Sequence, residues 1–414
     1  MRSFDVAVVG AGPVGSTAAF TTSKAGFRTL LVEEHSATGR PAHCTGKLSC
    51  EAFAEFSLPK ETILTAVRGA TFYSPQLKTC TVSKKTPDSY IVDREAFDQF
   101  IAQRAIDAGA SLLLGAKVCA VGRYTNGFRR LRIRRKDGWI EIDARIVINA
   151  EGAGQHLVPS LGISRLKTLK GLQYEMDGCN LDSTEFVEVY FGRKYAPGFF
   201  AWLVPTGEES AKVGLCMSEE LTSNSVRKTL DHLLRTHPSV VQKVGHARLK
   251  GVFGGRVPLH GPVSRTYDDA MLIVGDAAGH NKSTSGGGIY FGMKAARHAG
   301  NVAFHSLQKG KCMRKDLAAY ETLWNKDFGK ELRFTSMGRR ILNTLSDNDL
   351  EKLIDFFAHD ESLIRTVESD VTTSYQSAVW NPTISRIARR ALTRPRNLKL
   401  FAKVACLGLL SLYK

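Results

Sequence analysis

The sequence lacks the features that mark secreted, zinc-binding or membrane-spanning proteins. Its eight cysteines include no Cys-x-x-Cys pair, so neither a zinc site nor a disulfide framework is predicted, and a reducing compartment fits best. The chain starts Met1-Arg2-Ser3-Phe4 and passes at once into a strand pattern, without a secretory signal. No apolar run reaches the length that crosses a bilayer. These absences together predict a cytoplasmic protein.

Acidic residues are scarce, and beyond Asp370 there are none. The 57 Lys and Arg outnumber the 40 Asp and Glu, which gives a net charge of +17 and favours an anionic partner. The basic residues of the last segment, 384–414, are Arg386, Arg389, Arg390, Arg394, Arg396, Lys399, Lys403 and Lys414. Its apolar end, Leu398–Tyr413, suits a helix lying on the anionic inner face of the cell membrane. The alternative is a helix packed on the protein's own core.

Nucleic acid is not an expected partner, despite the positive charge. The sequence shows no helix-turn-helix, zinc-finger or RNP signature. The overall composition, with 43% hydrophobic and 23% charged residues, is that of an ordinary globular protein. A chain of 414 residues is long enough for two domains.

A glycine-rich turn near the N-terminus carries the strongest functional signal. The turn Gly10–Gly15 follows the buried strand pattern Phe4–Val9 and precedes a helix and a second strand, Arg28–Val32. In such a unit the first glycine permits the tight turn, the second admits a pyrophosphate and the third lets the helix pack on the strand. Glu33 stands where a carboxylate would bind the adenosine ribose. The residues assigned to a dinucleotide here are Gly10, Gly12, Pro13, Gly15, Glu33 and Glu34.

A second glycine-rich element, more than 250 residues later, indicates a dinucleotide held at both ends. The strand pattern Ala270–Val274 leads into an aspartate that can bind a ribose or ribitol hydroxyl. The glycines 286–288 open a helix whose N-terminus can face the electron-rich edge of a reduced flavin. Two such turns favour FAD as the cofactor. The residues assigned to it here are Gly275, Asp276, Gly287, Gly288 and Ile289.

Two further elements add cofactor candidates. Arg94 follows Asp93, a predicted N-cap, and can reach a phosphate or ribose, although the alternative is a surface arginine. The strand pattern Arg145–Ala150 ends in Glu151-Gly152, a third glycine turn at the edge where open α/β sheets bind ligands. A hairpin formed by 128–135 and 139–142 is expected before it.

The region 166–257 changes to short alternating strands, which predict an antiparallel sheet forming the floor of a substrate cavity. The segment Phe199–Pro205 is unusually aromatic. We expect its residues Phe200, Trp202 and Pro205 to bind substrate, against the alternative of an ordinary packed strand. The predicted domains are a discontinuous FAD-binding domain (1–70, 94–165 and 256–300), a substrate domain (71–93 and 166–255) and a C-terminal helical region (301–414).

Together these motifs resemble the geranylgeranyl reductase family, within the FAD-dependent monooxygenase-like flavoproteins. The resemblance runs from about residue 4 to residue 300. Its family-specific parts are Pro-x-x-Cys-x-Gly at 41–46 and Pro-x-x-aromatic-x-Trp-x-x-Pro at 197–205. The first of these and the run Ser283–Ile289 look most like archaeal members, which saturate the isoprenoid chains of membrane lipids.

The resemblance implies an α/β fold with a Rossmann-type FAD-binding domain, of the glutathione-reductase and p-hydroxybenzoate-hydroxylase kind. It also implies FAD that is reduced by a ferredoxin or NAD(P)H and passes hydride to a C=C bond of a prenylated lipid. Cys44 matches the family's cysteine near the flavin and Gly46 follows it, so both join the cofactor candidates. Cys44 and His43 are the catalytic candidates. The alternatives are a buried structural thiol and a solvent-facing histidine.

The chain departs from the family pattern at four positions. Glu151 replaces a usual Asp, Phe200 and Val204 replace Tyr and Phe, and Ser283 replaces Pro. The rival functions are a flavin-dependent monooxygenase or halogenase and an electron-transfer flavoprotein that serves a quinone or a protein partner. The absence of a cysteine cluster for an iron–sulfur centre weakens the last of these.

Overall fold

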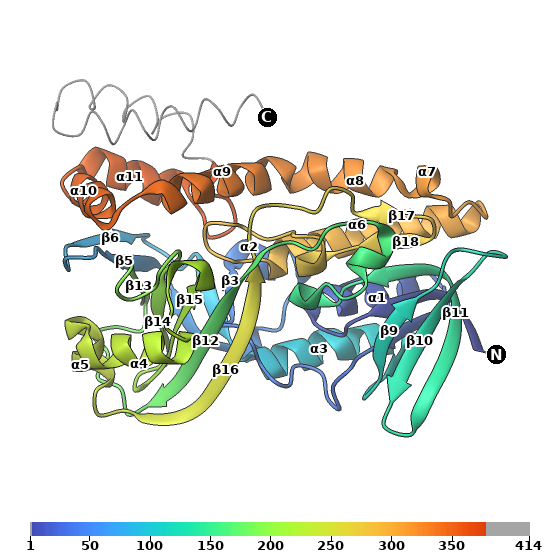
Figure 1. Cartoon of the computed structure of the whole chain (residues 1–414), viewed down its shortest axis with the longest axis horizontal. Coiled ribbons are helices and arrows are strands. Elements are labelled where there is room, and N and C mark those ends of the chain that lie inside the picture. The colour runs from blue at the N-terminus through green and yellow to red at the C-terminus, as the bar shows by residue number, and fades with distance from the viewer. Residues whose placement is uncertain (1, 378–414) are drawn as a thin grey trace. The chain divides into compact units, whose positions relative to one another are not determined.

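The computed structural model describes residues 2–377, which form two compact units (Figure 1). The first unit comprises the described residues up to Ala42, Asp93–Thr168 and Pro258–Arg333. The second comprises His43–Val92, Leu169–Val257 and the described residues from Phe334 onward. The basic tail segment 384–414 lies outside the described residues. Within residues 2–377, no helix is both long enough and apolar enough to cross a bilayer.

The first unit is an α/β unit built on a mostly parallel sheet. Its strands are β1 (Arg2–Val9), β2 (Thr29–Val32), β8 (Ser111–Leu113), β9 (Lys117–Val121), β10 (Arg129–Arg135), β11 (Gly138–Asn149), β17 (Tyr267–Asp268) and β18 (Met271–Ile273). Its helices are α1 (Pro13–Lys24), α3 (Arg94–Asp107), α6 (Ile289–Gln308), α7 (Arg314–Leu317) and α8 (Ala319–Trp324). Its short 3₁₀ and π turns are Gly152–Gly154, Val158–Leu161, Gly275–Ala277 and Asn325–Gly329. The strand order is β17-β18-β11-β1-β2-β8, and α1 packs against both α3 and α6.

The register of this sheet brings the carboxyl ends of its central strands to one edge. Val9 pairs with Val32 on β2 and with Asn149 on β11, and Asn149 pairs in turn with Ile273 on β18. All these pairings are parallel, and the second half of β1 (Val6–Val9) and the whole of β2 are buried, as expected for strands covered on both faces. The turns that follow these strands therefore lie side by side.

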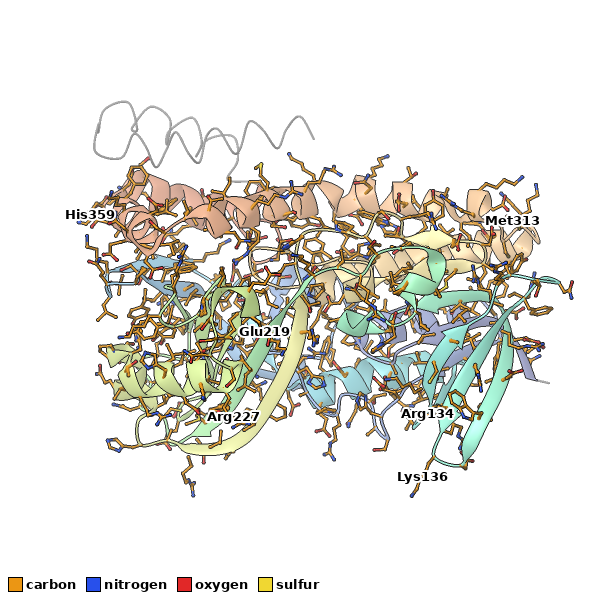
Figure 2. All side chains as sticks on the ribbon, viewed as in Figure 1. Arg134, Lys136, Glu219, Arg227, Met313 and His359 are labelled. Carbon is orange, nitrogen blue, oxygen red and sulfur yellow. The ribbon has the colours of Figure 1, made fainter. Side chains whose placement is uncertain are left out.

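Strand β11 joins the core sheet to an antiparallel meander. We expected two strands here, 139–142 and 145–150, but the structure has one continuous strand of 12 residues. Its first part pairs with β10 and its last part with β1 and β18, because it extends from the hairpin into the core. Figure 2 shows Arg134 and Lys136 projecting from the outer end of this hairpin. The expected hairpin is therefore present, with a longer second strand.

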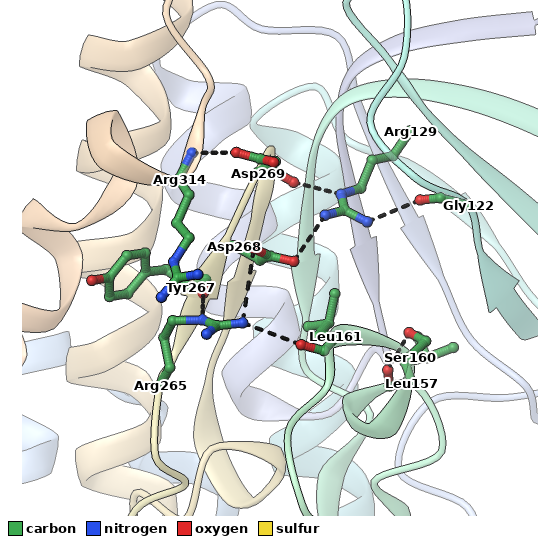
Figure 3. A network of polar contacts seen from close by, with 10 residues as sticks. All are labelled: Gly122, Arg129, Leu157, Ser160, Leu161, Arg265, Tyr267, Asp268, Asp269 and Arg314. Carbon is green, nitrogen blue, oxygen red and sulfur yellow. Dashed lines mark hydrogen bonds and ion pairs between the residues drawn. The ribbon is translucent and has the colours of Figure 1, made fainter.

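A buried arginine links the meander to β17 and β18 (Figure 3). Arg129 is 5% exposed and donates to the carbonyls of Asp269 at 2.5 Å and Gly122 at 2.9 Å, and it also pairs with Asp268 at 3.4 Å. Burial lowers the pKa of its guanidinium, and Asp268 opposes that shift. This network fixes the start of the strand that leads into Gly275.

The second unit contains the predicted substrate sheet. Its strands are β3 (Lys47–Ser49), β4 (Ile63–Val67), β5 (Gly69–Tyr73), β6 (Thr79–Ser83), β7 (Ser89–Val92), β12 (Thr168–Asp177), β13 (Phe186–Tyr190), β14 (Ala201–Gly207), β15 (Ser210–Met217) and β16 (Arg248–Pro258). Its helices are α2 (Cys50–Phe56), α4 (Val226–Thr236), α5 (Pro238–Val244), α9 (Lys330–Thr344), α10 (Asp347–Ala358) and α11 (Glu361–Asp370), with 3₁₀ turns at Lys60–Thr62 and Glu219–Leu221. The main sheet has the order β16-β12-β15-β14-β13-β5-β6. The pair β5–β13 is parallel, in contrast to the wholly antiparallel sheet that we expected, because β5 enters from an earlier segment of the chain.

Strand alternation gives this sheet two different faces. One face, which includes Ala201 and Leu203, belongs to a core that residues of α4 and α5 complete. On the other face Trp202 and Val204 pack with Val67 and Ile91 of the small sheet β3-β7-β4. We refer to the face with Trp202 as the Trp202 face.

The compact units and the sequence-based domain boundaries differ in two places. Residues 43–70 group with the second unit because β3 and β4 pair with β7. Residues 301–333 group with the first unit, where the Tyr320 hydroxyl donates to the carbonyl of Ile273 at 2.8 Å. Helices α10 and α11 remain with the second unit, where the Glu368 carboxylate accepts from the backbone N of Ser83 on β6. The expected helical region after residue 300 is therefore present within the described residues, but it is divided between the units.

Candidate functional site

The first glycine turn has the geometry of a dinucleotide-binding turn. Gly10 has a φ of +97°, and a Cβ at this position would lie 2.5 Å from the carbonyl oxygen of Ala150. A Cβ at Gly15 would lie only 1.8 Å from the carbonyl oxygen of Gly10. Both contacts are shorter than real Cβ contacts, so only glycine fits either position. The predicted tight turn and close helix packing are therefore present.

The N-terminus of α1 is open and has no side-chain cap. Gly12 is the N-cap, Pro13 opens the helix, no side chain accepts from the first-turn N–H groups, and no acidic residue lies in that turn. A Cβ at Gly12 would meet no atom within 4 Å. Free N–H groups and the positive end of the helix dipole beside open space suit an anion. The residues present therefore fit a pyrophosphate.

Glu33 ties the end of β2 to this turn. It is 9% exposed, and its Oε2 accepts from the backbone N of Ala11 at 2.8 Å. Its Oε1 accepts from the backbone N of His35 at 3.0 Å and contacts the imidazole. A carboxylate can accept further hydrogen bonds, which leaves room for a ribose hydroxyl. Glu34 instead pairs with Lys117 at 2.5 Å, in a partly exposed ion pair.

Arg94 is held by a carboxylate at the start of α3. Its Nε and Nη2 donate to the two carboxylate oxygens of Asp98 at 3.0 and 2.9 Å, and both side chains are nearly buried. Burial raises the pKa of Asp98, and Arg94 opposes that shift. The charge of Arg94 also acts on Asp276. Asp98 therefore orients an arginine whose charge lowers the pKa of Asp276.

Asp276 presents a carboxylate that has no hydrogen-bond partner among residues 2–377. It lies in the 3₁₀ turn Gly275–Ala277 and is half-buried. Burial raises the pKa of its carboxyl to about 6, and Arg94 opposes the shift. An unpaired, partly desolvated acceptor of this kind suits a ligand hydroxyl. The predicted contact with a ribitol or ribose hydroxyl therefore fits the geometry.

The second glycine-rich helix start repeats the arrangement at α1. Gly288 caps α6 without a side-chain cap, the first turn of α6 begins at Ile289, and it contains no acidic residue. Gly287 beside it is exposed. The turn after β11 is also open, because a Cβ at Gly152, where φ is +72°, would meet nothing within 4 Å. These positions leave space for a ligand at the same sheet edge.

Glu151 has a structural role that accounts for one departure from the family pattern. Its carboxylate accepts from the side chain of Asn149 at 2.8 Å and from the backbone N atoms of His156 at 2.7 Å and Leu157 at 2.9 Å. The longer side chain therefore shapes the turn that contains Gly152.

The substrate candidates lie in the second unit, and the structure brings two of the three together. Phe200 and Trp202 are half-buried, with ring centroids 6.1 Å apart. The Trp202 Nε1 donates to Gln173 Oε1 at 3.2 Å. Pro205 is buried and, by strand alternation, lies on the opposite face from Trp202. The Trp202 face therefore carries the aromatic surface that the sequence predicted.

The Cys44 loop lies against the same sheet. Cys44 is half-buried and its Sγ accepts from the backbone N of Gly46 at 3.4 Å, whereas His43 is exposed. The Lys212 Nζ donates to the carbonyl of Thr45 at 3.4 Å, which fixes the loop on β15. Cys44 also lies in the neighbourhood of Cys216 on β15.

Four residues of the second unit escaped the sequence analysis. Lys212 interrupts a mostly apolar run in β15 (Ser210–Met217), a signal that the sequence itself contains. Nothing in the local sequence marks the others, because they meet only through pairing of distant strands and packing of α9. These residues are Gln173, Lys212, Cys216 and Arg339.

Comparisons with known proteins all find FAD-dependent oxidoreductases. Residues 5–164 match the family model for FAD dependent oxidoreductases, and residues 168–252 match that for the geranylgeranyl reductase catalytic domain. Digeranylgeranylglycerophospholipid reductase 2 of Methanothermobacter thermautotrophicus is 32% identical over 85% of this chain and 91% of its own length.

Solved structures share the fold. A geranylgeranyl bacteriochlorophyll reductase-like protein from Thermoplasma acidophilum superposes with a TM-score of 0.81 at 25% identity, covering 94% of this chain and 99% of its own. A flavin-dependent brominase covers 93% of this chain and 100% of its own, with a TM-score of 0.72 at 15% identity, a likeness that concerns the fold alone. The expected Rossmann-type fold and the FAD cofactor are confirmed.

Proposed function

Since this chain belongs to the family of digeranylgeranylglycerophospholipid reductases, we propose that it uses FAD to saturate the C=C bonds of geranylgeranyl chains on an archaeal membrane lipid. Two observations together carry the proposal. The chain is 32% identical to a member of that family over most of both sequences, and its dinucleotide turn ends in an open helix N-terminus without a side-chain cap. The brominase likeness is confined to the fold, so it does not favour the halogenase rival.

The first unit would hold FAD through two open helix N-termini and two acidic side chains. The N-terminus of α1 receives the pyrophosphate, Glu33 the adenosine ribose and Asp276 a ribitol hydroxyl. The uncapped N-terminus of α6 would lie towards the flavin ring. When bound and reduced, the flavin supplies the hydride that this chemistry needs.

The second unit would hold the isoprenoid chain. Phe200 and Trp202 offer aromatic surface, and the hydrogen bond to Gln173 fixes the indole orientation. An apolar wall of this kind excludes water and keeps a long chain in one position. Phe200 lacks the hydroxyl of the family's usual tyrosine, so recognition of the chain relies on shape and apolar contact.

The chain must also supply a proton, because an isolated alkene is a poor hydride acceptor unless its other carbon is protonated. We assign this role to the Cys44 thiol, which is half-buried in the loop against β15. His43, adjacent in sequence and exposed, returns a proton from water to the sulfur. One proton and one hydride are then added per double bond, and the thiol is regenerated.

Two partners complete the proposal. A ferredoxin or NAD(P)H supplies the electrons, and the excess positive charge of the chain favours a position on an anionic membrane surface, where the lipid substrate is found. Sedimentation with anionic but not neutral vesicles tests the membrane part.

An anaerobic experiment tests the central reaction. The purified FAD-loaded protein is reduced with dithionite and mixed with a digeranylgeranylglyceryl lipid, and the lipid is followed by mass spectrometry. We expect a gain of one H2 per double bond together with reoxidation of the flavin. An unchanged lipid mass, with rapid reoxidation only when air is admitted, would contradict the proposal and favour a monooxygenase.

A further inference from the structure

Arg339 carries a positive charge into the interior of the second unit. It lies on α9 and is only 5% exposed. Its guanidinium stacks on Phe199, with Cζ 4.5 Å from the ring centroid. Burial lowers the pKa of the guanidinium to about 10, which leaves it charged at neutral pH.

No carboxylate neutralises this charge within residues 2–377. The Nε of Arg339 is buried without a hydrogen-bond partner, and Arg339 forms no ion pair with a described residue. The ionisable group that acts on it is Cys216, whose pKa is raised by burial to about 12, so that thiol is neutral. Residues 378–414 contain neither Asp nor Glu. Burying an unpaired charge is costly, and the contact with Phe199 offsets only part of that cost.

The surroundings of Arg339 connect it to the aromatic surface. Cys216 lies two residues beyond Gly214 on β15, and a Cβ at Gly214 would lie 2.7 Å from the Trp202 ring. Alternation places all three residues on the Trp202 face. Arg339 therefore stands at the end of a surface that continues through Cys216 to Trp202.

The other buried cation of this face is already engaged. Lys212 lies four residues before Cys216 on the same strand and face, on the order of 13 Å away at the rise of an extended strand. Its Nζ is 3.7 Å from the Glu175 carboxylate and donates to the carbonyl of Thr45. Among the residues that the structure describes, Arg339 is thus a buried cation beside this face without an anionic partner.

We propose that Arg339 binds the phosphate of the lipid substrate, while Phe200 and Trp202 contact its isoprenoid chain. This inference rests on the proposed function. A guanidinium binds phosphate through two parallel N–H···O contacts and is the preferred side chain for such recognition.

Equilibrium binding tests the proposal without relying on turnover. The probes are digeranylgeranylglyceryl phosphate and digeranylgeranylglycerol, which differ only in the phosphate. Each is titrated in micelles against the oxidised FAD-loaded protein and followed by tryptophan fluorescence. The variants are R339Q and R339K, with R340Q as the matched control, because Arg340 is the next residue of α9 and is exposed.

We expect the native protein to bind the phosphorylated lipid at least about tenfold more tightly than the neutral one. R339Q should lose at least about tenfold in affinity for the phosphorylated lipid and keep its affinity for the neutral lipid, with R339K in between. R340Q should bind both lipids like the native protein. Equal losses for both lipids in R339Q, or no loss at all, would overturn the proposal.

Three further measurements make the test decisive. Thermal melting reports whether each variant folds, and R339M, with an apolar side chain of similar length, replaces R339Q if that variant does not. One contrary outcome is that inorganic phosphate raises the melting temperature of the native protein but not of R339M while the native protein binds both lipids equally. That result would assign the site to free phosphate and overturn the proposal that Arg339 binds a lipid headgroup. Anaerobic saturation of the neutral lipid distinguishes failure of the Arg339 proposal from failure of the proposed function. The native protein should still saturate this lipid if Arg339 has no role, and should not saturate it if the protein is not a reductase.

Discussion

The carboxylate of Asp276 lies directly against the backbone of Gly288, at the start of α6. A Cβ at Gly288 would be 2.7 Å from Asp276 Oδ1, closer than real side chains approach. Asp276 follows the end of β18, and Gly288 is the N-cap of α6, the long helix that comes next. Their contact sets the position of an unpaired carboxylate at the proposed flavin site.

Gly288→Ala should therefore release FAD. The added methyl displaces the Asp276 carboxylate, so we expect FAD affinity to fall at least about tenfold, as for the loss of one good ligand contact. The ratio of flavin to protein absorbance after dialysis measures this. Gly254→Ala is the matched control, since this exposed glycine lies on β16 in the second unit and its Cβ would come no closer than 3.7 Å to a residue beyond its chain neighbours. Full FAD retention by the Gly288 variant would contradict this account of the site.

Asp276→Asn should stabilise the FAD-free protein in a pH-dependent way. Burial raises the pKa of Asp276 from its usual 3.8 to about 6. The folded state therefore holds this proton more tightly than the unfolded state, and stability is lost as the pH rises through about 6. The asparagine avoids this loss, so we expect it to be about 2 kcal/mol more stable at pH 7.5. Urea unfolding between pH 4 and pH 8 should show that the advantage disappears at the acid end, and a constant difference would rule out this source.

Trp202→Ala should weaken substrate binding and spare FAD binding. The indole faces the proposed lipid site and is oriented by Gln173, so we expect KM for the lipid to rise about tenfold or more. Trp139→Ala serves as the control because Trp139 is 51% exposed on the hairpin of the first unit. Steady-state kinetics with matched flavin content distinguishes the two variants. An equal effect of both would remove Trp202 from the substrate site.

Cys44→Ser should lower the rate of lipid saturation by about a hundredfold or more, the usual effect of losing a general acid. Flavin content and its reduction by dithionite should not change. Cys119→Ser is the control, since that thiol is exposed on β9. Single-turnover reoxidation of the reduced flavin by the lipid provides the measurement. Turnover within about twofold of the native enzyme would leave Cys44 a structural thiol.

Arg129→Ala should destabilise the first unit, whereas its neighbour Arg130→Ala should not. Arg129 is buried and donates to the carbonyls of Gly122 and Asp269 (Figure 3), and we expect its loss to cost about 2–4 kcal/mol. Arg130 forms an exposed pair with Asp143, worth less than about 1 kcal/mol. Denaturant unfolding of both variants compares them. Similar free energies of unfolding would mean that the buried network carries little of the stability.

The sequence was most informative where structure is set by neighbouring residues. The requirement for glycine at Gly10 and Gly15 follows from a turn of six residues, so it was visible in their spacing. The length of β11 was not, because its last half is defined by pairing with β1 and β18 rather than by its own pattern.

Side-chain partners from distant segments were beyond prediction. Glu34 resembled a cofactor ligand by position, but it pairs with Lys117 across the sheet. Pro205 belongs to the aromatic motif, yet strand alternation turns it away from Trp202. Arg339 gave no signal at all, because its contact with Phe199 joins residues separated by more than 100 positions.

The first unit is built from three separate segments of the chain, and this affects how it folds during synthesis. Met271 of β18 pairs with Val147 of β11, and more than 100 residues, among them Leu169–Val257 of the second unit, separate them in the sequence. During synthesis the edge of β11 must therefore remain unpaired until β18 leaves the ribosome. An open strand edge of this kind invites association with other nascent chains. The protein should consequently depend on chaperones during translation more than its final stability would suggest.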